Sequence, residues 1–257
     1  AKDLVGRVLS QKYNPFFFVE NLNTVQALLS RMDRIRDEHD LILYEIDESL
    51  KNGPKYMSSI LKPQYACITN MLDSHIGYIG SQEKINEQIA GITFGLKKEG
   101  YLIINADDYE SANYRFDCNV LRVGINDKSA DYYATDIEYT PNGMNFNIRY
   151  EGGVENVDLS LFGKHNVYNA MMAFVIGILE NIPMKKIKSA LKNYHATGIR
   201  QHVIKDKNRI LYIDCFNASP TSISAALSTL SNIAIKNGKI VGRGHNRVLL
   251  KEDPTCH

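Results

Sequence analysis

Residues 65–108, "YACITNMLDSHIGYIGSQEKINEQIAGITFGLKKEGYLIINADD", decide the fold of this chain. The apolar runs "YACITNML" and "GYLIINADD" are typical of buried strands, and "QEKINEQIAGITFGL" between them has the pattern of a helix. Strands that alternate with helices predict a parallel sheet. Asn70 lies near the end of the first strand, and Asn105, Asp107 and Asp108 follow the second. Ligands of such sheets bind beyond the carboxyl ends of the strands, so a functional site is expected there.

The rest of the chain extends this α/β pattern. Residues 118–162 alternate or run apolar around a "PNG" turn, which predicts a small antiparallel patch inserted in the α/β core or attached to it. The further predicted elements are a helix (2–13), a short buried strand ending on Glu45 (40–46), two helices (165–181 and 184–194) and a strand (209–213) in a new unit beginning near Gly198. The expected fold class is α/β, a mostly parallel sheet flanked by helices.

Composition excludes several classes of protein. The 257 residues carry a net charge of +1, which gives no support for a nucleic-acid partner. The longest apolar run, "MMAFVIGIL", is too short to cross a membrane, and "AKDLVGRVLSQKY" is charged throughout, unlike a secretory leader. The four cysteines form no CxxC pair, so free thiols in a reducing cytoplasm are expected.

The segment "DCFNASPTSISAAL" (214–227) joins a predicted strand to a predicted helix. Asp214 stands at the strand tip, where a carboxylate can accept hydrogen bonds from ribose hydroxyls. A capped turn that launches the helix accounts for Ser219 and Pro220 equally well, but it does not require Asp214.

Several motifs occur in the order found in one enzyme family. "ENLNT" (20–24), "ITNMLDSHIGYIGSQEKI" (68–85), "LIINADD" (102–108), "GKHNVYNAMMAF" (163–174), "TGIRQHV" (197–203) and "DCFNASPTSISAAL" together resemble the Mur ligases. The resemblance implies an ATP- and Mg²⁺-dependent peptide ligase of cell-wall synthesis. Its substrates would be UDP-N-acetylmuramoyl-tripeptide and D-alanyl-D-alanine, joined through an acyl phosphate. Positioning and charge neutralisation would carry most of the catalysis.

The resemblance also implies domains and site residues. Residues 1–197 would form the central ATP-binding domain, 198–241 part of a Rossmann-like C-terminal domain, and 242–257 an unmatched polar tail. The implied residues are Glu45 and His75 for the metal, His75 and Arg200 for catalysis, His165, Asn166, Arg200, Asp214 and Asn217 for the nucleotide, and Asn21 and Asn23 for the substrate.

Each of these residues also has a structural interpretation. Glu45 could be a solvated acid beside Asp47 and Glu48, and His75 could be structural. Asn166 could cap a helix, a position where asparagine is favoured. Arg200 could form a hinge salt bridge. The asparagines of "ENLNT" could be turn residues.

The chain departs from the family pattern at three places. The phosphate-binding loop G-x-x-x-x-G-K-[ST] would end just before Ala1, and neither it nor the UDP-binding N-terminal domain is in the sequence. Ile89 stands where the family has a lysine that is carbamylated to help hold a second Mg²⁺. After "GKIV", the segment "GRGHNRVLLKEDPTCH" has no match. We expect the chain by itself to be incompetent for ligation, with an upstream segment or a partner supplying the phosphate half.

Two other functions stay open. One is a degenerate paralogue that keeps the nucleotide-side fold as a binding or scaffold protein, which Ile89 favours because truncation does not explain that residue. The other is a related amide ligase with a different amino-acid substrate, such as a folate-type glutamate ligase, which "NASPTS" makes the weaker candidate.

Overall fold

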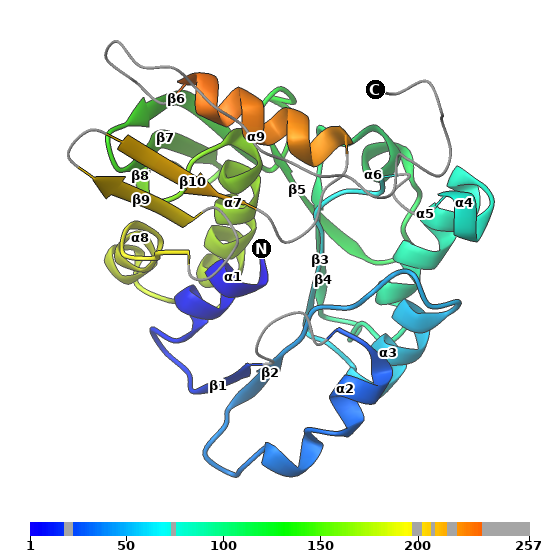
Figure 1. Ribbon diagram of the computed structural model, residues 1–257. Coiled ribbons are helices and arrows are strands. Elements are labelled where there is room, and N and C mark those ends of the chain that lie inside the picture. The colour runs from blue at the N-terminus through cyan, green and yellow to red at the C-terminus, as the bar shows by residue number, and fades with distance from the viewer. Residues whose placement is uncertain (18–22, 73–75, 197–201, 207–208, 215–219, 233–257) are drawn as a thin grey trace.

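A computed structural model describes residues 1–17, 23–72, 76–196, 202–206, 209–214 and 220–232 of the chain. Its main feature is a six-stranded sheet of order β3-β4-β5-β6-β7-β8, parallel from β3 to β6 and antiparallel from β6 to β8 (Figure 1). The strands are β3 (Tyr65–Ile68), β4 (Tyr101–Asn105), β5 (Asn119–Gly124), β6 (Tyr132–Thr140), β7 (Gly143–Tyr150) and β8 (Gly153–Leu159). The predicted mixed α/β class is confirmed.

Helices cover both faces of this sheet (Figure 1). One layer contains α1 (Lys2–Leu9), α7 (Lys164–Leu179) and α8 (Met184–Lys192). The other side carries α3 (Gly53–Leu61), α4 (Ile76–Ile79), α5 (Gln82–Ala90), the 3₁₀ helix η2 (Gly91–Thr93) and α6 (Tyr109–Asn113). A smaller group contains α2 (Val25–Leu29) and the 3₁₀ helix η1 (Met32–Arg34).

The side chains of β4 point alternately to the two faces of the sheet and so belong to two separate cores. Ile103 faces the α1–α7–α8 layer, whereas Leu102 and Ile104 face the layer that contains α5, and none of the three is exposed. This is the two-residue period of a strand that is buried on both faces. On the first side α7 is apolar almost all round, and ten of its residues are buried. α7 is therefore the central helix of the larger core.

The predicted strand at 40–46 is shorter and less buried than expected. β2 (Leu41–Leu43) pairs in parallel with β1 (Pro15–Phe17) in a separate two-stranded sheet, and the side chain of Ile42 is 40% exposed. Glu45 lies two residues beyond the strand and is exposed. The prediction of a buried strand ending on Glu45 was thus wrong in length and burial, because a two-stranded sheet has few neighbours to cover it.

The region 118–162 is not an added patch. β5 pairs in parallel with β4, and only β6, β7 and β8 are antiparallel. The antiparallel strands continue the parallel sheet without interruption. Periodicity cannot identify a strand's partner, which explains why β5 was assigned to the wrong group.

The predicted helix at 82–96 ends early. α5 stops at Ala90, and the short η2 leads into Gly95. A Cβ atom at position 95 would lie 1.9 Å from the carbonyl oxygen of Ser58, so a glycine is needed where this segment meets α3. The predicted helix at 2–13 is shorter too, because α1 ends at Leu9.

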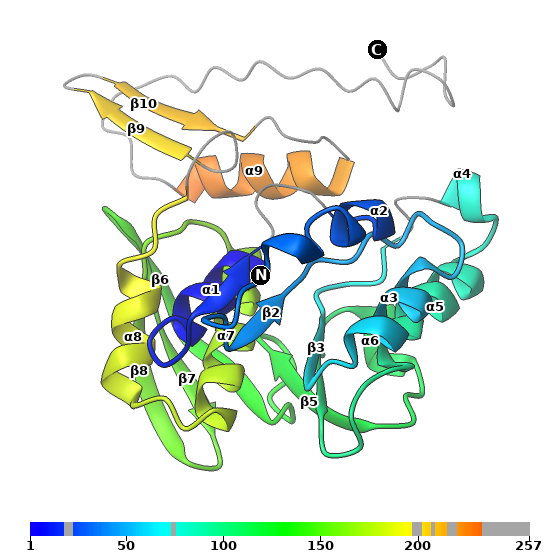
Figure 2. The ribbon, with the colours of Figure 1, turned by 90° about the horizontal axis from the view of Figure 1, so that it is seen from below.

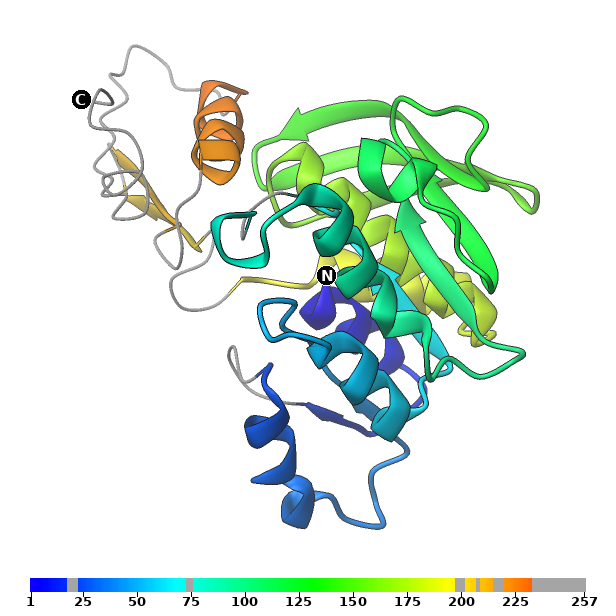
Figure 3. The ribbon, with the colours of Figure 1, turned by 90° about the vertical axis from the view of Figure 1, so that its right-hand side faces the viewer.

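The C-terminal part begins with a hairpin. β10 (Arg209–Ile213) is the predicted strand, and it pairs antiparallel with β9 (His202–Asp206), which the sequence patterns missed. α9 (Pro220–Asn232) lies between this hairpin and the six-stranded sheet (Figures 2 and 3). Among the helices in the described part of the chain, none combines the length and apolar character that a bilayer crossing needs.

Two of the cysteines lie in the described residues, and both are free thiols. Burial raises the pKa of the Cys67 thiol to about 12, from an ordinary value of 9.0. At pH 8 this lowers the thiolate fraction about a thousandfold, so we expect iodoacetamide to label Cys67 in the folded chain far more slowly than in urea. Peptide mass spectrometry of samples quenched at timed intervals measures the ratio of the two labelling rates. Equal labelling rates in the folded and unfolded chains would contradict this prediction.

Candidate functional site

The densest polar cluster at the strand ends surrounds Asp107, just after β4. Its carboxylate accepts hydrogen bonds from the backbone amides of Ile125, Asn126 and Asp127 at 2.6, 2.9 and 2.7 Å. It also accepts one from the Tyr168 hydroxyl of α7 at 2.6 Å. Asp107 therefore ties the end of β4 to the β5–β6 loop and to the first half of α7.

These bonds lower the pKa of Asp107. Partial burial by itself would raise its pKa, but the hydrogen bonds from Tyr168 and the three amides outweigh burial and lower it. The Tyr168 phenol has a raised pKa, first because of burial and then because of the bond to Asp107. At neutral pH the pair is a carboxylate that accepts from a neutral phenol.

Asn105 and Asp108 connect the neighbouring elements. Asp108 accepts from the backbone amide of Met71, after β3, and from that of Ser111 in α6, both at 3.0 Å. Asn105 donates to the carbonyl of Thr69 at 3.3 Å. The segment "NADD" thus fixes the ends of β3 and β4 and the start of α6. Sequence patterns placed these residues at the strand tip but gave none of them a role.

The first turn of α7 carries two of the predicted nucleotide-side residues. Asn166 is 5% exposed and donates from Nδ2 to the carbonyl of Phe162 at 2.8 Å. The N-cap is Gly163, so the interpretation of Asn166 as a cap was wrong. Asn169, one turn later, donates to Oδ1 of Asn166 at 3.2 Å. Its spacing of three from Asn166 was a signal that the sequence analysis missed.

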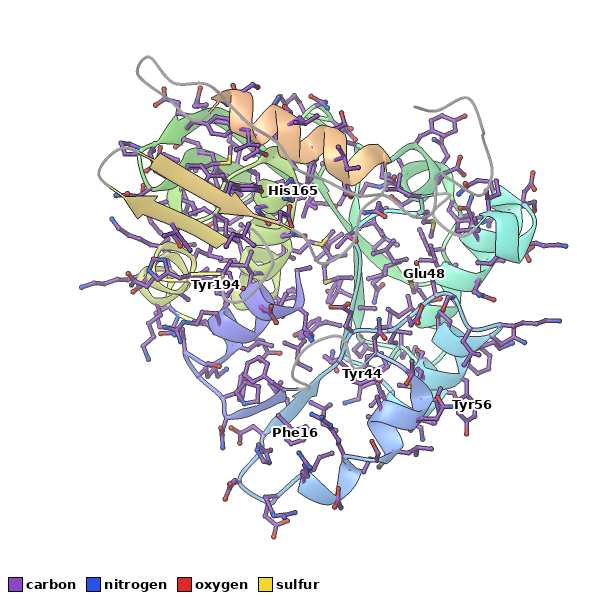
Figure 4. All side chains as sticks on the ribbon, viewed as in Figure 1. Phe16, Tyr44, Glu48, Tyr56, His165 and Tyr194 are labelled. Carbon is purple, nitrogen blue, oxygen red and sulfur yellow. The ribbon has the colours of Figure 1, made fainter. Side chains whose placement is uncertain are left out.

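His165 lies half-buried at the same turn (Figure 4). Gly163, with φ +95°, lies beside it: a Cβ atom at 163 would be 2.6 Å from Cε1 of His165 and 2.8 Å from Oγ1 of Thr229. Thr229 belongs to α9 and is 1% exposed. The C-terminal helix therefore packs directly against the start of α7.

Asp214 is exposed, immediately after β10. The pKa of its neighbour Tyr212 is raised by burial and then by the Asp214 carboxylate, and the charge of Tyr139 in β6 acts in the same direction. Tyr139 is hydrogen-bonded to Thr229, which also touches position 163. These contacts bring the end of β10 to the same region as the start of α7.

A cavity of about 760 Å³ lies next to this region. Phe162, whose carbonyl accepts from Asn166, forms part of its wall. Its lining includes the buried Met144 and Leu159 and the exposed Lys192 and His195. This volume is within the range typical of small-molecule sites.

The predicted metal residue Glu45 belongs to an acidic loop with Asp47 and Glu48, the last of which is labelled in Figure 4. The Asp47 amide donates to the carbonyl of Asn23 at 3.1 Å, so the loop lies beside the described end of "ENLNT". The pKa of Tyr44 is raised to about 12 by burial, then by Asp47, then by Glu45. Within the residues that the structure describes, no group of three or more His, Cys, Asp or Glu side chains could hold a metal ion. Mg²⁺ needs only one or two carboxylates when phosphates supply the rest, so Glu45 and Asp47 fit that requirement.

Ile89 packs against the core around Leu102 and Ile104. The residue before it faces the acidic loop instead: Gln88 donates to the carbonyl of Glu48 and accepts from the amide of Asn52. The remaining predicted residues lie outside the described part of the chain, namely Asn21, His75, Arg200 and Asn217.

The layered α/β fold, with its polar residues at the strand ends and at the start of α7, belongs to the class of ligand-binding α/β domains. The model of the Mur ligase middle domain matches residues 1–177. The chain belongs to the Mur ligase family.

Known proteins agree with this assignment. The UDP-N-acetylmuramoyl-tripeptide–D-alanyl-D-alanine ligase of Bacillus subtilis is 30% identical over 259 residues, which cover all of this chain and 56% of that protein. MurF from Acinetobacter baumannii superposes with a TM-score of 0.81 at 25% identity, over 90% of this chain and 51% of the other. A MurF ligase from Thermotoga maritima in complex with ADP shares the fold, with a TM-score of 0.80 at 19% identity, over 90% of this chain and 54% of the other. The chain thus spans about half the length of its relatives.

Proposed function

We propose that this chain forms the nucleotide-binding middle part of an ATP-dependent peptide ligase that adds D-alanyl-D-alanine to UDP-N-acetylmuramoyl-tripeptide in peptidoglycan synthesis. The name of the Bacillus subtilis relative supports this choice of substrates. The observation that carries the proposal is the contact between α9, the helix that follows Asp214 along the chain, and the start of α7, which carries His165 and Asn166: Oγ1 of Thr229 lies beside Gly163.

Each described residue has a chemical part in this proposal. The Asn166 amide has a donor and an acceptor that suit the edge of adenine, and His165 lies beside it. Asp214 would accept from the ribose hydroxyls. Glu45, with Asp47 next to it, would hold Mg²⁺, which neutralises phosphate charge when bound. For the residues outside the described part, we keep the assignment of His75 to the metal and of Arg200 and Asn217 to the nucleotide. Asn21 and Asn23 stay assigned to the muramoyl-peptide side.

The proposed division of the chain is a nucleotide domain up to residue 197 and the beginning of a C-terminal domain from 198 to 241. The second candidate function is a binding or scaffold protein without ligase activity. It is favoured by Ile89, whose side chain packs in a core and cannot form a carbamate. A cytoplasmic location stays a prediction.

Calorimetric titration with Mg²⁺ and a non-hydrolysable ATP analogue tests the nucleotide site. We expect a dissociation constant of about 10 μM, or −6.8 kcal/mol. Asn166→Ala and Asp214→Ala should each weaken binding at least about tenfold, because each removes a polar contact to the nucleoside. Asn113→Ala and Asp117→Ala, at exposed positions near α6, are matched controls and should bind like the wild type.

Circular dichroism of every variant must first show a folded chain. No heat up to millimolar ligand from a folded wild-type chain would rule out the nucleotide site and favour the scaffold. Binding that survives both substitutions would show that the nucleotide occupies another place.

A further inference from the structure

Tyr168 has no part in the proposed function, yet it makes a hydrogen bond to a carboxylate between α7 and the strand ends. Its hydroxyl donates to Asp107 at 2.6 Å. Asp107 is itself held by three backbone amides of the β5–β6 loop, so the acceptor is rigidly placed. Hydrogen bonds to a charged acceptor are stronger than neutral ones.

The position of Tyr168 on α7 allows its hydrogen bond to Asp107 to affect the orientation of Asn166. The two residues are two positions apart, about 200° around a helix with 3.6 residues per turn, so they face different neighbours. Asn166 faces the loop before the helix through the Phe162 carbonyl, and Tyr168 faces the end of β4. A small rotation of the first turn about the helix axis would therefore disturb both contacts: it would break one of these two hydrogen bonds or move its partners.

The start of α7 also lacks the usual means of fixing a helix end. Its N-cap is Gly163, which has no side chain to accept from the first amides. The far end of α7 is held by the same kind of contact: Glu180, the C-cap residue, accepts from the hydroxyls of Tyr13 and Tyr65 at 2.5 and 2.7 Å. A phenol–carboxylate bond thus holds each end of the helix.

We infer that Tyr168 and Asp107 form a positioning pair that sets the rotation of the first turn of α7, and with it the orientation of the Asn166 amide and the preference for adenine. This inference rests on the proposed nucleotide site. The pair does not touch the ligand; it acts through Asn166. The pair therefore sets the selectivity of the site for the base, in addition to its contribution to stability.

Tyr168→Phe tests the inference, with Tyr65→Phe as the matched control. Both changes remove one phenol–carboxylate bond to or from α7, but Tyr65 acts at the end away from Asn166. Affinities for ATP and ITP, which differ in the hydrogen-bonding edge of the base, are measured with Mg²⁺ by calorimetry. In parallel, ¹H–¹⁵N NMR follows the Asn166 side-chain amide without nucleotide.

The expected result is that Tyr168→Phe lowers the preference for ATP over ITP about tenfold and shifts the Asn166 amide signals, whereas Tyr65→Phe changes neither. Equal loss of preference in both variants would overturn the inference, since general loosening of α7 would explain it. So would an unchanged preference in Tyr168→Phe when the wild type is selective, and in that case the proposed function would stand. Failure of the wild type to bind either nucleotide would reject the proposed function, and the inference with it.

Discussion

Replacing Asp107 with alanine is expected to lower the free energy of unfolding by about 3 kcal/mol, since hydrogen bonds to charged groups contribute about 1.5–3 kcal/mol each and are not additive. The change removes the acceptor of the Ile125, Asn126 and Asp127 amides and of the Tyr168 hydroxyl. Ile125 is 8% exposed, so its amide regains water poorly, whereas the exposed Asn126 can be solvated again. Urea unfolding followed by circular dichroism measures the loss.

The stability difference between the wild type and Asp107→Ala should depend on pH in one direction. The pKa of Asp107 in the folded chain lies below its ordinary value of 3.8, because the hydrogen bonds outweigh burial. A carboxyl with a lowered folded pKa stabilises the protein fully above its unfolded pKa and loses that effect as pH falls through the folded pKa. The stability gap between wild type and Asp107→Ala should therefore be constant above about pH 5 and shrink below about pH 4.

Asp127→Ala is the control for this prediction. Asp127 lies in the same loop and also has a lowered pKa, owing to the hydroxyl and the amide of Ser129. Its carboxylate is open to solvent, so screening leaves little net stabilisation, and we expect a change within about 0.5 kcal/mol. A similar loss in both variants would mean that loop sequence, and not the strand-end cluster, determines the stability.

The parallel half of the fold could be predicted because its signals are local. The apolar runs "YACITNML" and "GYLIINADD", with Asn70 and Asp107 near their ends, identified β3 and β4. Pairing is not local. Nothing in "CNVLRVGI" distinguishes a parallel partner of β4 from an antiparallel one, and β9 has the polar residues His202 and Lys205 in a strand of five. Tertiary context determined both the parallel pairing of β5 and the formation of β9.

The site could be predicted only where a residue type implied its chemistry. Asp214 and Glu45 were proposed because carboxylates after strands suggest ligands; both are exposed, and their roles stay predictions. Asn166 fits two roles from sequence, and the helix boundary at Gly163 removed one of them. The partnership of Asp107 with Tyr168 spans 61 residues, and no spacing rule connects them. Contacts of this kind between distant residues can be identified only from the three-dimensional structure.

Phe174→Ala is expected to destabilise the chain most, by about 4 kcal/mol, because truncating a buried phenylalanine leaves a cavity that the core only partly refills. Phe174 lies in the middle of α7 with no exposed surface. Its ring meets those of Tyr150 and Tyr132 edge-on, with centroids 5.6 and 6.4 Å away, so the substitution removes contacts between α7 and the antiparallel strands.

Phe94→Ala is the matched control, since it deletes the same atoms from a side chain that is 63% exposed and contacts Lys55 with its ring. Its cost should stay within about 1 kcal/mol. Urea unfolding of the two variants at pH 7 measures both values. Equal losses would show that α7 is not the centre of the larger core, and they would remove the rigid base on which Asn166 and Tyr168 depend. A large loss for Phe174→Ala alone, with nucleotide affinity falling in proportion to the unfolded fraction, would show that the core supports the site without tuning it.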